Sequence, residues 1–507
     1  MAGKIIEINT DGLQSVKVGD GLFENRAAVV DLMQQSVPAE VTIVIQAYGR
    51  LEKTKRCVDS VLKYTKEINY ELVLIDNGST DNTLEYFQSV PWGKKIIWHI
   101  SQNMGSMYPS LMLGLRDFGR YICIIANDII VTENWLNNLL ACMNSDPKIG
   151  MVVPVSSNVS NLQEVDLPYK TYHDMQAAAT KFNRSDPQRW EDRLRLITPG
   201  ALYRKEILLA LGWPLGDVGF FHDFGDDDVS FAIRRMGYRT VLAGDTWVCH
   251  DHDYKHGEGK TPEEFTRSLN IGRANFQEKY FGVDAWDDVN NYYMSYLNNL
   301  PHTKDCFVRR VLGVDVRCGT PILDIKNRLR KLSIYDVELS AFTQNPKYWT
   351  DLKTICSGIV ACDREEFLID SFPRGYFDYI VADRPLNCYH EPQKMINDLF
   401  ALCKPGGTVL CKVKNAFSFL DFVQLLGQRD VSAGEFFYNI SLETFYKVLS
   451  KLGMIKNIFK VPYSVPIEQR QILESLIPND LPAEQKKDIV DRMLCEEFIF
   501  IVQTNLS

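Results

Sequence analysis

Three groups of acidic and histidine side chains in this sequence could perform chemistry together. Asp128 directly follows the apolar run YICIIAN, where a carboxylate is costly unless it is paired or coordinates a cation. The acids 226–228 are consecutive, and their mutual repulsion raises at least one pKa, which suits a general base. His250 begins the sequence His-Asp-His-Asp after a second apolar run, where an imidazole can bind a metal. Together these groups predict a divalent-cation site with a carboxylate base.

Each group also has a simpler explanation. Asp128 could cap a helix expected near Thr132, and spacing alone does not separate a helix cap from a metal ligand. The acids 226–228 could stabilise the positive end of a helix dipole, although three adjacent carboxylates exceed what a cap requires. His250 could be an ordinary buried or exposed histidine.

The elements that must position these groups are strands that alternate with helices. The expected strands of the first half are 41–48, 71–76, 94–100 and 121–128. A helical pattern over 51–64 lies between the first two, as in βαβ units of a mostly parallel α/β sheet. Ligands of such sheets bind outside the carboxyl ends of the strands. We therefore expect Tyr48, Asp76 and Asp128 to meet in one crevice, with Tyr48 available for stacking.

A second α/β rhythm begins near Val311. Its expected strands are 313–316, 333–339, 376–383 and 407–413. We divide the chain into an N-terminal extension (1–38), a first α/β domain (39–283), a connector (284–304) and a second α/β domain (305–507). The predicted fold class is therefore two α/β domains in tandem.

Composition limits the classes of function. The chain has 507 residues with 56 Lys and Arg against 65 Asp and Glu, a net charge of -9, which disfavours binding to nucleic acid. The longest apolar run is far shorter than the about 20 residues of a membrane span. The 12 cysteines show no CxxC spacing, and no signal-peptide profile opens the sequence. We expect a soluble cytoplasmic protein; the oligomeric state is not predicted.

The order of motifs resembles the family 2 glycosyltransferases, which have the GT-A nucleotide-diphospho-sugar fold. The matching segments are VTIVIQAYGRLEKTKRCVDSVLKYT, YELVLIDNGSTDNT, the Asn103 loop, YICIIANDIIVTENWLNNLL, TPGALYRKEILLALGW, FGDDDVSFAIRRMGY, TWVCH and RANFQEKYFG. They extend over about residues 40 to 283.

The resemblance implies a role for each matching residue. The nucleotide-sugar would contact Gln46, Ala47, Tyr48, Arg50, Asp76, Asn77, Asn103, Gly105, Asn127 and Gly200. Asp128 would hold Mn²⁺ or Mg²⁺ on the two phosphates, with His250 as a further ligand. Alignment through Arg234 makes Asp228 the catalytic base and Asp227 its neighbour. The acceptor hydroxyl would attack the opposite face of the sugar, so that one displacement inverts the anomeric centre.

Three positions depart from the family pattern. Asn127 stands where many relatives have an acid, which leaves one carboxylate at the metal. Asp227 replaces the usual glutamate, and Ser230 replaces a later aspartate.

The second domain resembles the class I S-adenosylmethionine-dependent methyltransferases. The matching segments are GVDVRCGTP, SIYDVELS and FDYIVADRPLNCYHEPQKMINDLFALCKPGGTVLCKVKN. Glu338 would be the ribose-binding acid. However, Arg317 and Pro321 replace two of the three glycines of the cofactor loop and leave only Gly319, so the backbone cannot approach the cofactor closely. We therefore expect a scaffold without S-adenosylmethionine binding or methyl transfer.

The resemblance thus predicts an inverting, metal-dependent glycosyltransferase. The expected donor is a UDP-sugar, with N-acetylglucosamine as the sugar. The expected acceptor is Ser or Thr of a protein, such as bacterial flagellin, and a glycan or lipid-linked saccharide is the alternative. Two other functions remain open: a bifunctional glycosyltransferase and methyltransferase of surface-glycan synthesis, and a non-catalytic binding scaffold on a transferase fold.

Overall fold

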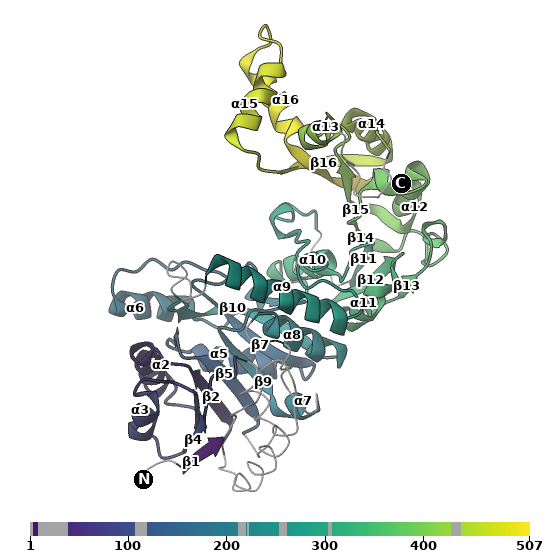
Figure 1. The fold of residues 1–507 in the computed structure, drawn as a ribbon. Helices are drawn as coiled ribbons and strands as arrows, with labels where there is room; N and C mark the ends of the chain where they lie inside the picture. The colour runs from purple at the N-terminus through teal and green to yellow at the C-terminus, as the bar shows by residue number, and fades with distance from the viewer. Residues whose placement is uncertain are drawn as a thin grey trace. The chain divides into compact units, whose positions relative to one another are not determined.

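A computed structural model describes most of the chain. The described residues are 4–8, 39–106, 119–210, 220, 223–252, 261–302, 307–426 and 438–506. The chain divides into two compact units, Met1–Asn290 and Asn291–Ser507 (Figure 1). This division falls inside the stretch 284–304 that the sequence suggested as a connector.

The first unit is built on one large mixed sheet. Its strands are β1 (Lys4–Ile8), β2 (Val41–Ala47), β3 (Tyr70–Asn77), β4 (Lys95–Ile100), β5 (Tyr121–Ala126), β6 (Ile129–Ile130), β7 (Ile149–Ser156), β8 (Trp190–Asp192), β9 (Gly200–Arg204) and β10 (Arg239–His250). The order is β1-β4-β3-β2-β5-β9-β7-β10-β6, and β8 pairs with β10. Most neighbours are parallel, whereas β6, β8 and β9 run antiparallel to theirs. The predicted parallel α/β sheet is confirmed.

Helices cover both faces of this sheet. They are α2 (Leu51–Tyr64), α3 (Thr83–Ser89), α5 (Trp135–Asn144), α6 (Tyr172–Phe182), α7 (Lys205–Ala210), α8 (Gly225–Arg235) and α9 (Pro262–Lys279). Alternate residues of β2 face opposite sides: Ile43 and Ile45 pack in a cluster with α2, α3 and α5, and Val44 packs in a cluster with α6, α7 and α8. The helix predicted over 51–64 is α2.

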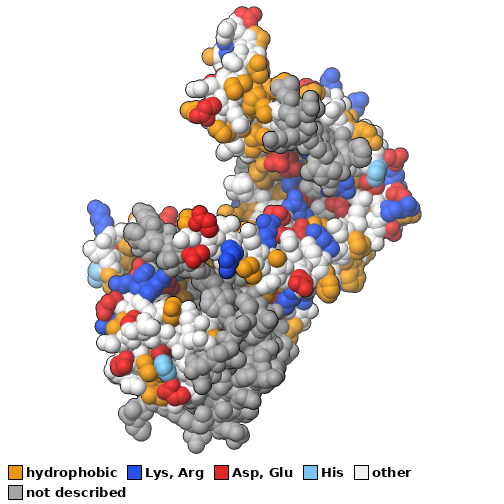
Figure 2. All heavy atoms as spheres, viewed as in Figure 1, with side chains coloured by type: hydrophobic (Ala, Val, Ile, Leu, Met, Phe, Trp, Pro, Cys, Tyr) orange, Lys and Arg blue, Asp and Glu red, His pale blue; other side chains and the backbone are white. Residues whose placement is uncertain are grey.

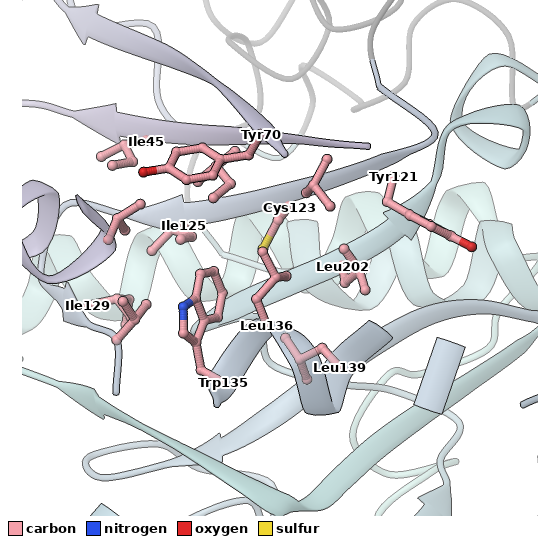
Figure 3. Close-up of a cluster of buried hydrophobic side chains, with 14 of the residues drawn as sticks. Ile45, Tyr70, Tyr121, Cys123, Ile125, Ile129, Trp135, Leu136, Leu139 and Leu202 are labelled. Atoms are coloured by element: carbon pink, nitrogen blue, oxygen red, sulfur yellow. The ribbon is translucent and has the colours of Figure 1, made fainter. Parts of the chain in front are cut away.

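The first of these clusters holds the strand tips in place. Figure 3 shows Trp135 and Leu136 of α5 beside Ile125 and Cys123 of β5. The Trp135 indole also donates a hydrogen bond to Thr65 Oγ1 at 3.1 Å, so this large ring is both packed and satisfied. The carboxyl end of β5, and the residues that follow it, therefore extend from a fixed core.

The N-terminal extension contributes one strand to the sheet. β1 pairs in parallel with β4, with Glu7 opposite His99. The rest of the predicted extension, residues 9–38, lies outside the described residues.

The second unit is a seven-stranded sheet of Rossmann type. Its strands are β11 (Arg309–Val314), β12 (Val337–Thr343), β13 (Val360–Cys362), β14 (Phe377–Ala382), β15 (Cys403–Lys414), β16 (Gly453–Pro462) and β17 (Cys495–Thr504), in the order β13-β12-β11-β14-β15-β17-β16. The helices are α10 (Thr320–Lys331), α11 (Trp349–Ile355), α12 (Pro392–Leu402), α13 (Phe419–Leu426), α14 (Leu442–Leu452), α15 (Ile467–Leu476) and α16 (Ala483–Met493). β17 is antiparallel to both of its neighbours, and the remaining pairs are parallel.

One strand of this unit differs from its prediction. We expected a strand over 333–339 that ends near Glu338, whereas β12 begins at Val337 and continues to Thr343. The reason is register: Val337 pairs with Arg309, so the strand extends alongside β11 through Phe342. Glu338 therefore lies at the amino end of β12, and its expected role as a ribose-binding acid at the carboxyl end is wrong.

The surface mixes both signs of charge with scattered hydrophobic side chains (Figure 2). Exposed apolar side chains on α15 include Ile467, Ile472 and Leu476. Across the described ranges, no helix has the length and hydropathy needed to cross a bilayer.

Candidate functional site

Three adjacent strands of the first unit end at the same edge of the sheet. β3, β2 and β5 are parallel neighbours that end at Asn77, Ala47 and Ala126. The antiparallel β9 begins at this edge, because Gly200 pairs with Ile125 of β5. The expected convergence of the strand tips is confirmed, and this is the edge where α/β sheets bind ligands.

A cluster of one carboxylate and two imidazoles lies just beyond the tip of β5. Asp128 Oδ1 is 3.6 Å from His250 Nε2, and Asp128 Oδ2 is 3.4 Å from His252 Nδ1. One possible ligand atom of each residue lies within 4.8 Å of the other two, so a single metal ion could contact all three. The sequence predicted Asp128 and His250 as ligands, and the structure adds His252.

The alternation of side chains at the end of β10 accounts for both imidazoles reaching Asp128. Residues two apart in an extended segment project to the same side, and the residue between them projects to the other. Asp251 accordingly forms ion pairs with Lys53 and Arg56 of α2. Its backbone N–H also donates to the Asp128 carbonyl at 2.8 Å, which ties the two segments together.

A neighbouring loop orients the His250 ring. Its Nδ1 lies 3.0 Å from the Asn158 carbonyl, which can only accept, so Nδ1 carries the proton and donates. Nε2 is then the ring nitrogen that faces Asp128. The Asn158 side chain donates to the His250 carbonyl at 2.9 Å, and Ser157 Oγ accepts from the His250 backbone N–H at 3.1 Å. Such supporting hydrogen bonds are typical of metal-binding histidines.

Asp128 is held in its ionised form. Only 6% of the residue is exposed, and burial alone would raise its pKa. Hydrogen bonds and charge interactions with His250 and His252 outweigh burial and hold the pKa of this carboxyl below its ordinary range. Arg50 adds a guanidinium nitrogen 3.6 Å from Oδ2. Asp128 does not cap the next helix, because α5 begins at Trp135 with Asn134 as its N-cap. The geometry therefore favours the metal-ligand alternative.

Asn127 braces the turn between β2 and α2. Its side-chain amide donates to the Gly49 carbonyl at 3.1 Å and to Thr54 Oγ1 at 2.9 Å. An aspartate could not donate either bond. The two donated hydrogen bonds account for an amide at the position where many relatives have an acid. They also direct the Asn127 side chain toward the turn.

The same turn carries the predicted nucleotide-binding residues of β2. Gln46 is half-buried, Ala47 is buried, and Tyr48 is 54% exposed at the strand tip. Arg50 has a positive φ of 57°, which is uncommon for a residue with a side chain. Its left-handed backbone places the guanidinium beside Asp128, and backbone conformations of this kind cluster at functional sites.

Asp76 at the end of β3 is connected to a histidine that the sequence analysis did not single out. Asp76 Oδ2 lies 2.7 Å from His99 Nδ1, and Oδ1 accepts from the Ser79 N–H at 3.0 Å. His99 stands opposite Asp76 on β4. The carboxylate is therefore fixed in orientation at the sheet edge.

Three other predicted residues brace one another. Asn77 donates to Asn103 Oδ1 at 3.2 Å and to the Gly105 carbonyl at 2.8 Å, and it accepts from the Met104 N–H. The turn after Asn77 also needs glycine, since a Cβ on Gly78 would lie 2.4 Å from the Gln102 carbonyl carbon. These contacts hold the loop after β4 against the tip of β3.

Gly200 has open space beside it. A Cβ added there would meet no atom within 4 Å, apart from its own chain neighbours. Gly200 is therefore not needed for packing at this position, and the open space adjoins the tip of β5.

The three consecutive acids of α8 point in three directions. Asp227 is 3% exposed and pairs with Arg195. Asp228 is also 3% exposed; its Oδ1 accepts from the Tyr280 hydroxyl at 2.7 Å and lies 2.7 Å from Lys279 Nζ. Asp226 is half-buried and accepts from the Thr198 hydroxyl. The chain thus separates three carboxylates that the sequence could not distinguish.

Asp226 contacts the segment that leads into β9 at the strand-tip edge. Its partner Thr198 stands two residues before Gly200, the first residue of β9 and the partner of Ile125. Burial raises the pKa of Asp226, the negative charge of Asp227 raises it further, and the Thr198 hydrogen bond opposes both. Burial also raises the pKa of Asp227 in spite of Arg195.

Sequence reasoning missed four other residues of this region. His252 could have been found from the His-x-His spacing after a strand. Arg195, Lys279 and Tyr280 gave no signal, because their contacts with Asp227 and Asp228 join residues 32 to 52 positions apart. Lys279 and Tyr280 reach Asp228 only because the end of α9 packs beside α8.

Comparisons with known proteins find related sequences. Residues 42–212 match the family model described as glycosyl transferase family 2. Glycosyltransferase GlyG of Streptococcus pneumoniae serotype 4 is 31% identical over 101 residues, which cover 20% of this chain and 33% of that protein. An uncharacterised glycosyltransferase of Haemophilus influenzae is 29% identical over 112 residues, which cover 22% of this chain and 34% of that protein. The chain spans between 16% and 34% of the length of the curated relatives it matches.

Similar solved structures are more distant. The crystal structure of GalNAc-T7 with UDP, GalNAc and Mn²⁺ is 15% identical, covers 57% of this chain and 62% of that chain, and has a TM-score of 0.38. The crystal structure of the CurJ carbon methyltransferase is 15% identical, covers 42% of this chain and 52% of that chain, and has a TM-score of 0.27. The match to the glycosyl transferase family 2 model extends over the strands from β2 to β9 of the sheet described above.

Proposed function

We propose that the first unit transfers a sugar from a nucleotide-sugar donor to an acceptor hydroxyl, with inversion at the anomeric carbon. The observation that carries this proposal is the Asp128, His250 and His252 cluster beside the tips of β2, β3 and β5. The family 2 match over residues 42–212 supports it independently.

The cation site suits Mn²⁺ better than Mg²⁺. Mg²⁺ prefers oxygen ligands and retains its water, whereas imidazole nitrogen suits transition metals. Two of the three candidate ligands are imidazoles, and His250 Nε2 is already presented by the Asn158 contact. A bound cation would neutralise the charge that gathers on a diphosphate leaving group.

We propose Asp226 as the carboxylate that accepts the proton of the acceptor hydroxyl. The sequence alignment assigned this role to Asp228, with Asp227 beside it. Both of those carboxylates are buried in ion pairs, with Lys279 and with Arg195. Asp226 accepts from the Thr198 hydroxyl, is half-buried, and has a raised pKa, as suits a general base.

The finer identity of the substrates is proposed from the sequence resemblance. The donor is a UDP-sugar, with N-acetylglucosamine as the first to be tested. The acceptor is a hydroxyl of a protein such as flagellin, or of a glycan. The rate must be measured with each member of a panel of UDP- and GDP-sugars. One contact in a pocket changes rates by only about 10–200-fold, so a single active donor does not identify the preferred one.

The direct test is the release of nucleoside diphosphate by the purified full chain. We expect slow release from one donor with Mn²⁺, strong stimulation by the correct acceptor, and no release with EDTA. Asp128→Ala should abolish the metal dependence. His173→Ala is the matched control, because the His173 side chain is 95% exposed and lies on α6 away from the cluster. Failure of every donor to react would favour a binding scaffold over an enzyme.

A further inference from the structure

The second unit has a ligand edge of its own. β12, β11 and β14 are parallel neighbours. Gln344, Asp315 and Asp383 directly follow their respective carboxyl ends. Ligands of α/β sheets bind at this edge. The methyltransferase resemblance implies S-adenosylmethionine, which carries a sulfonium and an ammonium group and therefore needs space and anionic or polar partners.

The carboxylate after β11 already accepts three hydrogen bonds from the protein. Asp315 Oδ1 accepts from the Gln344 N–H at 2.8 Å. Asp315 Oδ2 accepts from the Gln344 side chain and from the Tyr389 hydroxyl, both at 2.9 Å. The Tyr389 side chain is 1% exposed. Asp315 therefore fastens two neighbouring loops together.

The carboxylate after β14 is neutralised by cations of the chain. Asp383 Oδ1 lies 2.6 Å from Lys412 Nζ, and Oδ2 lies 3.8 Å from Arg317 Nε. Lys412 also lies 3.4 Å from Glu497. Burial opposes a charged lysine, but the carboxylates of Asp383 and Glu497 raise its pKa. Asp383 and its partners thus form a buried network of both signs of charge.

The segment that leads into β11 covers the same edge. The Asn291 side chain donates to Asp383 Oδ2 at 2.8 Å and to the Val316 carbonyl at 3.3 Å. Tyr293 is 1% exposed, and its ring lies 5.4 Å from Lys412 Nζ. Its N–H donates to Asp324 of α10 at 2.6 Å. Residues 291–293 therefore lie where a ligand would contact Asp383.

The loop after β11 does not have the form of a cofactor cradle. Arg317 has a positive φ of 53°, and its side chain is 42% exposed. Pro321 lies in the first turn of α10, where it offers no N–H. The remaining Gly319 is explained by packing, since its φ is 108° and a Cβ would lie 2.4 Å from Ile355 Cδ1. The residues present do not fit S-adenosylmethionine.

We infer that the ligand edge of the second unit is occupied by the chain's own residues 291–293, Arg317 and Lys412, so that this edge does not bind S-adenosylmethionine. The chain's cations stand in the position where a cationic cofactor would be neutralised. The network stabilises the unit in place of a ligand.

Two measurements on the full chain test this inference. In calorimetry with S-adenosylmethionine and S-adenosylhomocysteine, we expect no saturable binding below about 1 mM. A micromolar dissociation constant for either compound would overturn the inference.

The second measurement is the thermal unfolding of Lys412→Met. Removing one partner of a buried pair leaves uncompensated charge, so the unfolding temperature of the second unit should fall by on the order of 10 °C. Lys404→Met is the matched control, because Lys404 pairs with Asp378 at 2.9 Å but is 31% exposed. We expect a fall of no more than about 2 °C for the control. Equal stability of the two variants would contradict the network's role; loss of folding only in Lys412→Met would support it.

Discussion

The two units present the same kind of sheet edge with opposite chemistry. In the first unit, the carboxylate after β5 faces two imidazoles, one of which is oriented by the Asn158 carbonyl so that its Nε2 faces the carboxylate. In the second unit, the carboxylate after β14 faces a lysine and an arginine of the same chain. A metal ion can join the first group, whereas the second is already neutral. The comparison shows that the residues at strand tips determine function, and the fold alone does not.

The supporting contacts follow the same division. Around Asp128, the loop residues Ser157 and Asn158 orient the neighbouring His250. Around Asp383, Asn291 donates directly to the carboxylate. Polar side chains thus prepare one edge for a ligand and close the other.

The largest expected effect comes from removing the metal-binding carboxylate. Asp128→Ala should lower turnover of the nucleotide-sugar by on the order of 10⁴-fold, because a metal contributes several kcal/mol to a charged transition state. EDTA should have the same effect on the native chain. Steady-state release of nucleoside diphosphate measures both. Activity that survives EDTA would contradict the proposed metal site, and with it the proposed difference between the edges of the two units.

A second prediction separates the acids of α8. Asp226→Asn should lower turnover by about 10³-fold with little change in donor binding, as expected for loss of a general base. Asp228→Asn should mainly destabilise the first unit, because it disturbs the contacts with Tyr280 and Lys279. Turnover and thermal unfolding are measured on both variants. If only Asp228→Asn loses turnover while it stays folded, the sequence assignment of the base is correct.

A third prediction concerns the ligand that the sequence analysis did not assign. His252→Ala should weaken Mn²⁺ binding by about 10–100-fold, with a proportionate loss of activity that higher Mn²⁺ partly restores. His252→Asp should shift the preference toward Mg²⁺, because it replaces nitrogen with oxygen. Metal titrations of activity, with His173→Ala beside them, measure both effects. An unchanged metal response in both His252 variants would limit the site to Asp128 and His250.

The smallest expected effect tests the explanation of Asn127. Asn127→Asp should lower stability by about 1–3 kcal/mol, because two donated hydrogen bonds are lost. It should not increase activity, although it restores an acid. Asn82→Asp is the control, since Asn82 precedes α3 without a side-chain capping bond. Chemical denaturation gives the free energies of unfolding; tighter metal binding by Asn127→Asp would contradict our account.

Elements with strong local patterns could be predicted from the sequence. β2 and β5 are mainly apolar runs, and α2 has its buried positions on one face, so their bounds were close to the prediction. The end of β12 was missed because it depends on pairing with β11. The start of α3 at Thr83 accompanies a local turn, in which Asp81 accepts from the Thr83 N–H.

The candidate site was predictable in residue type but not in orientation. Asp128 and His250 follow apolar runs, which marks strand ends that carry polar groups. The directions of Asp226, Asp227 and Asp228 depend on Thr198, Arg195 and α9, which are distant in sequence. The closure of the second unit likewise depends on residues 291–293, which were expected to form only a connector.

The most direct test is electron paramagnetic resonance of Mn²⁺ bound to the full chain. We predict one high-affinity Mn²⁺ per chain, tightened by the nucleoside diphosphate, abolished in Asp128→Ala, weakened in His252→Ala and unchanged in His173→Ala. Binding of Mn²⁺ that is equal in all four proteins would contradict the account.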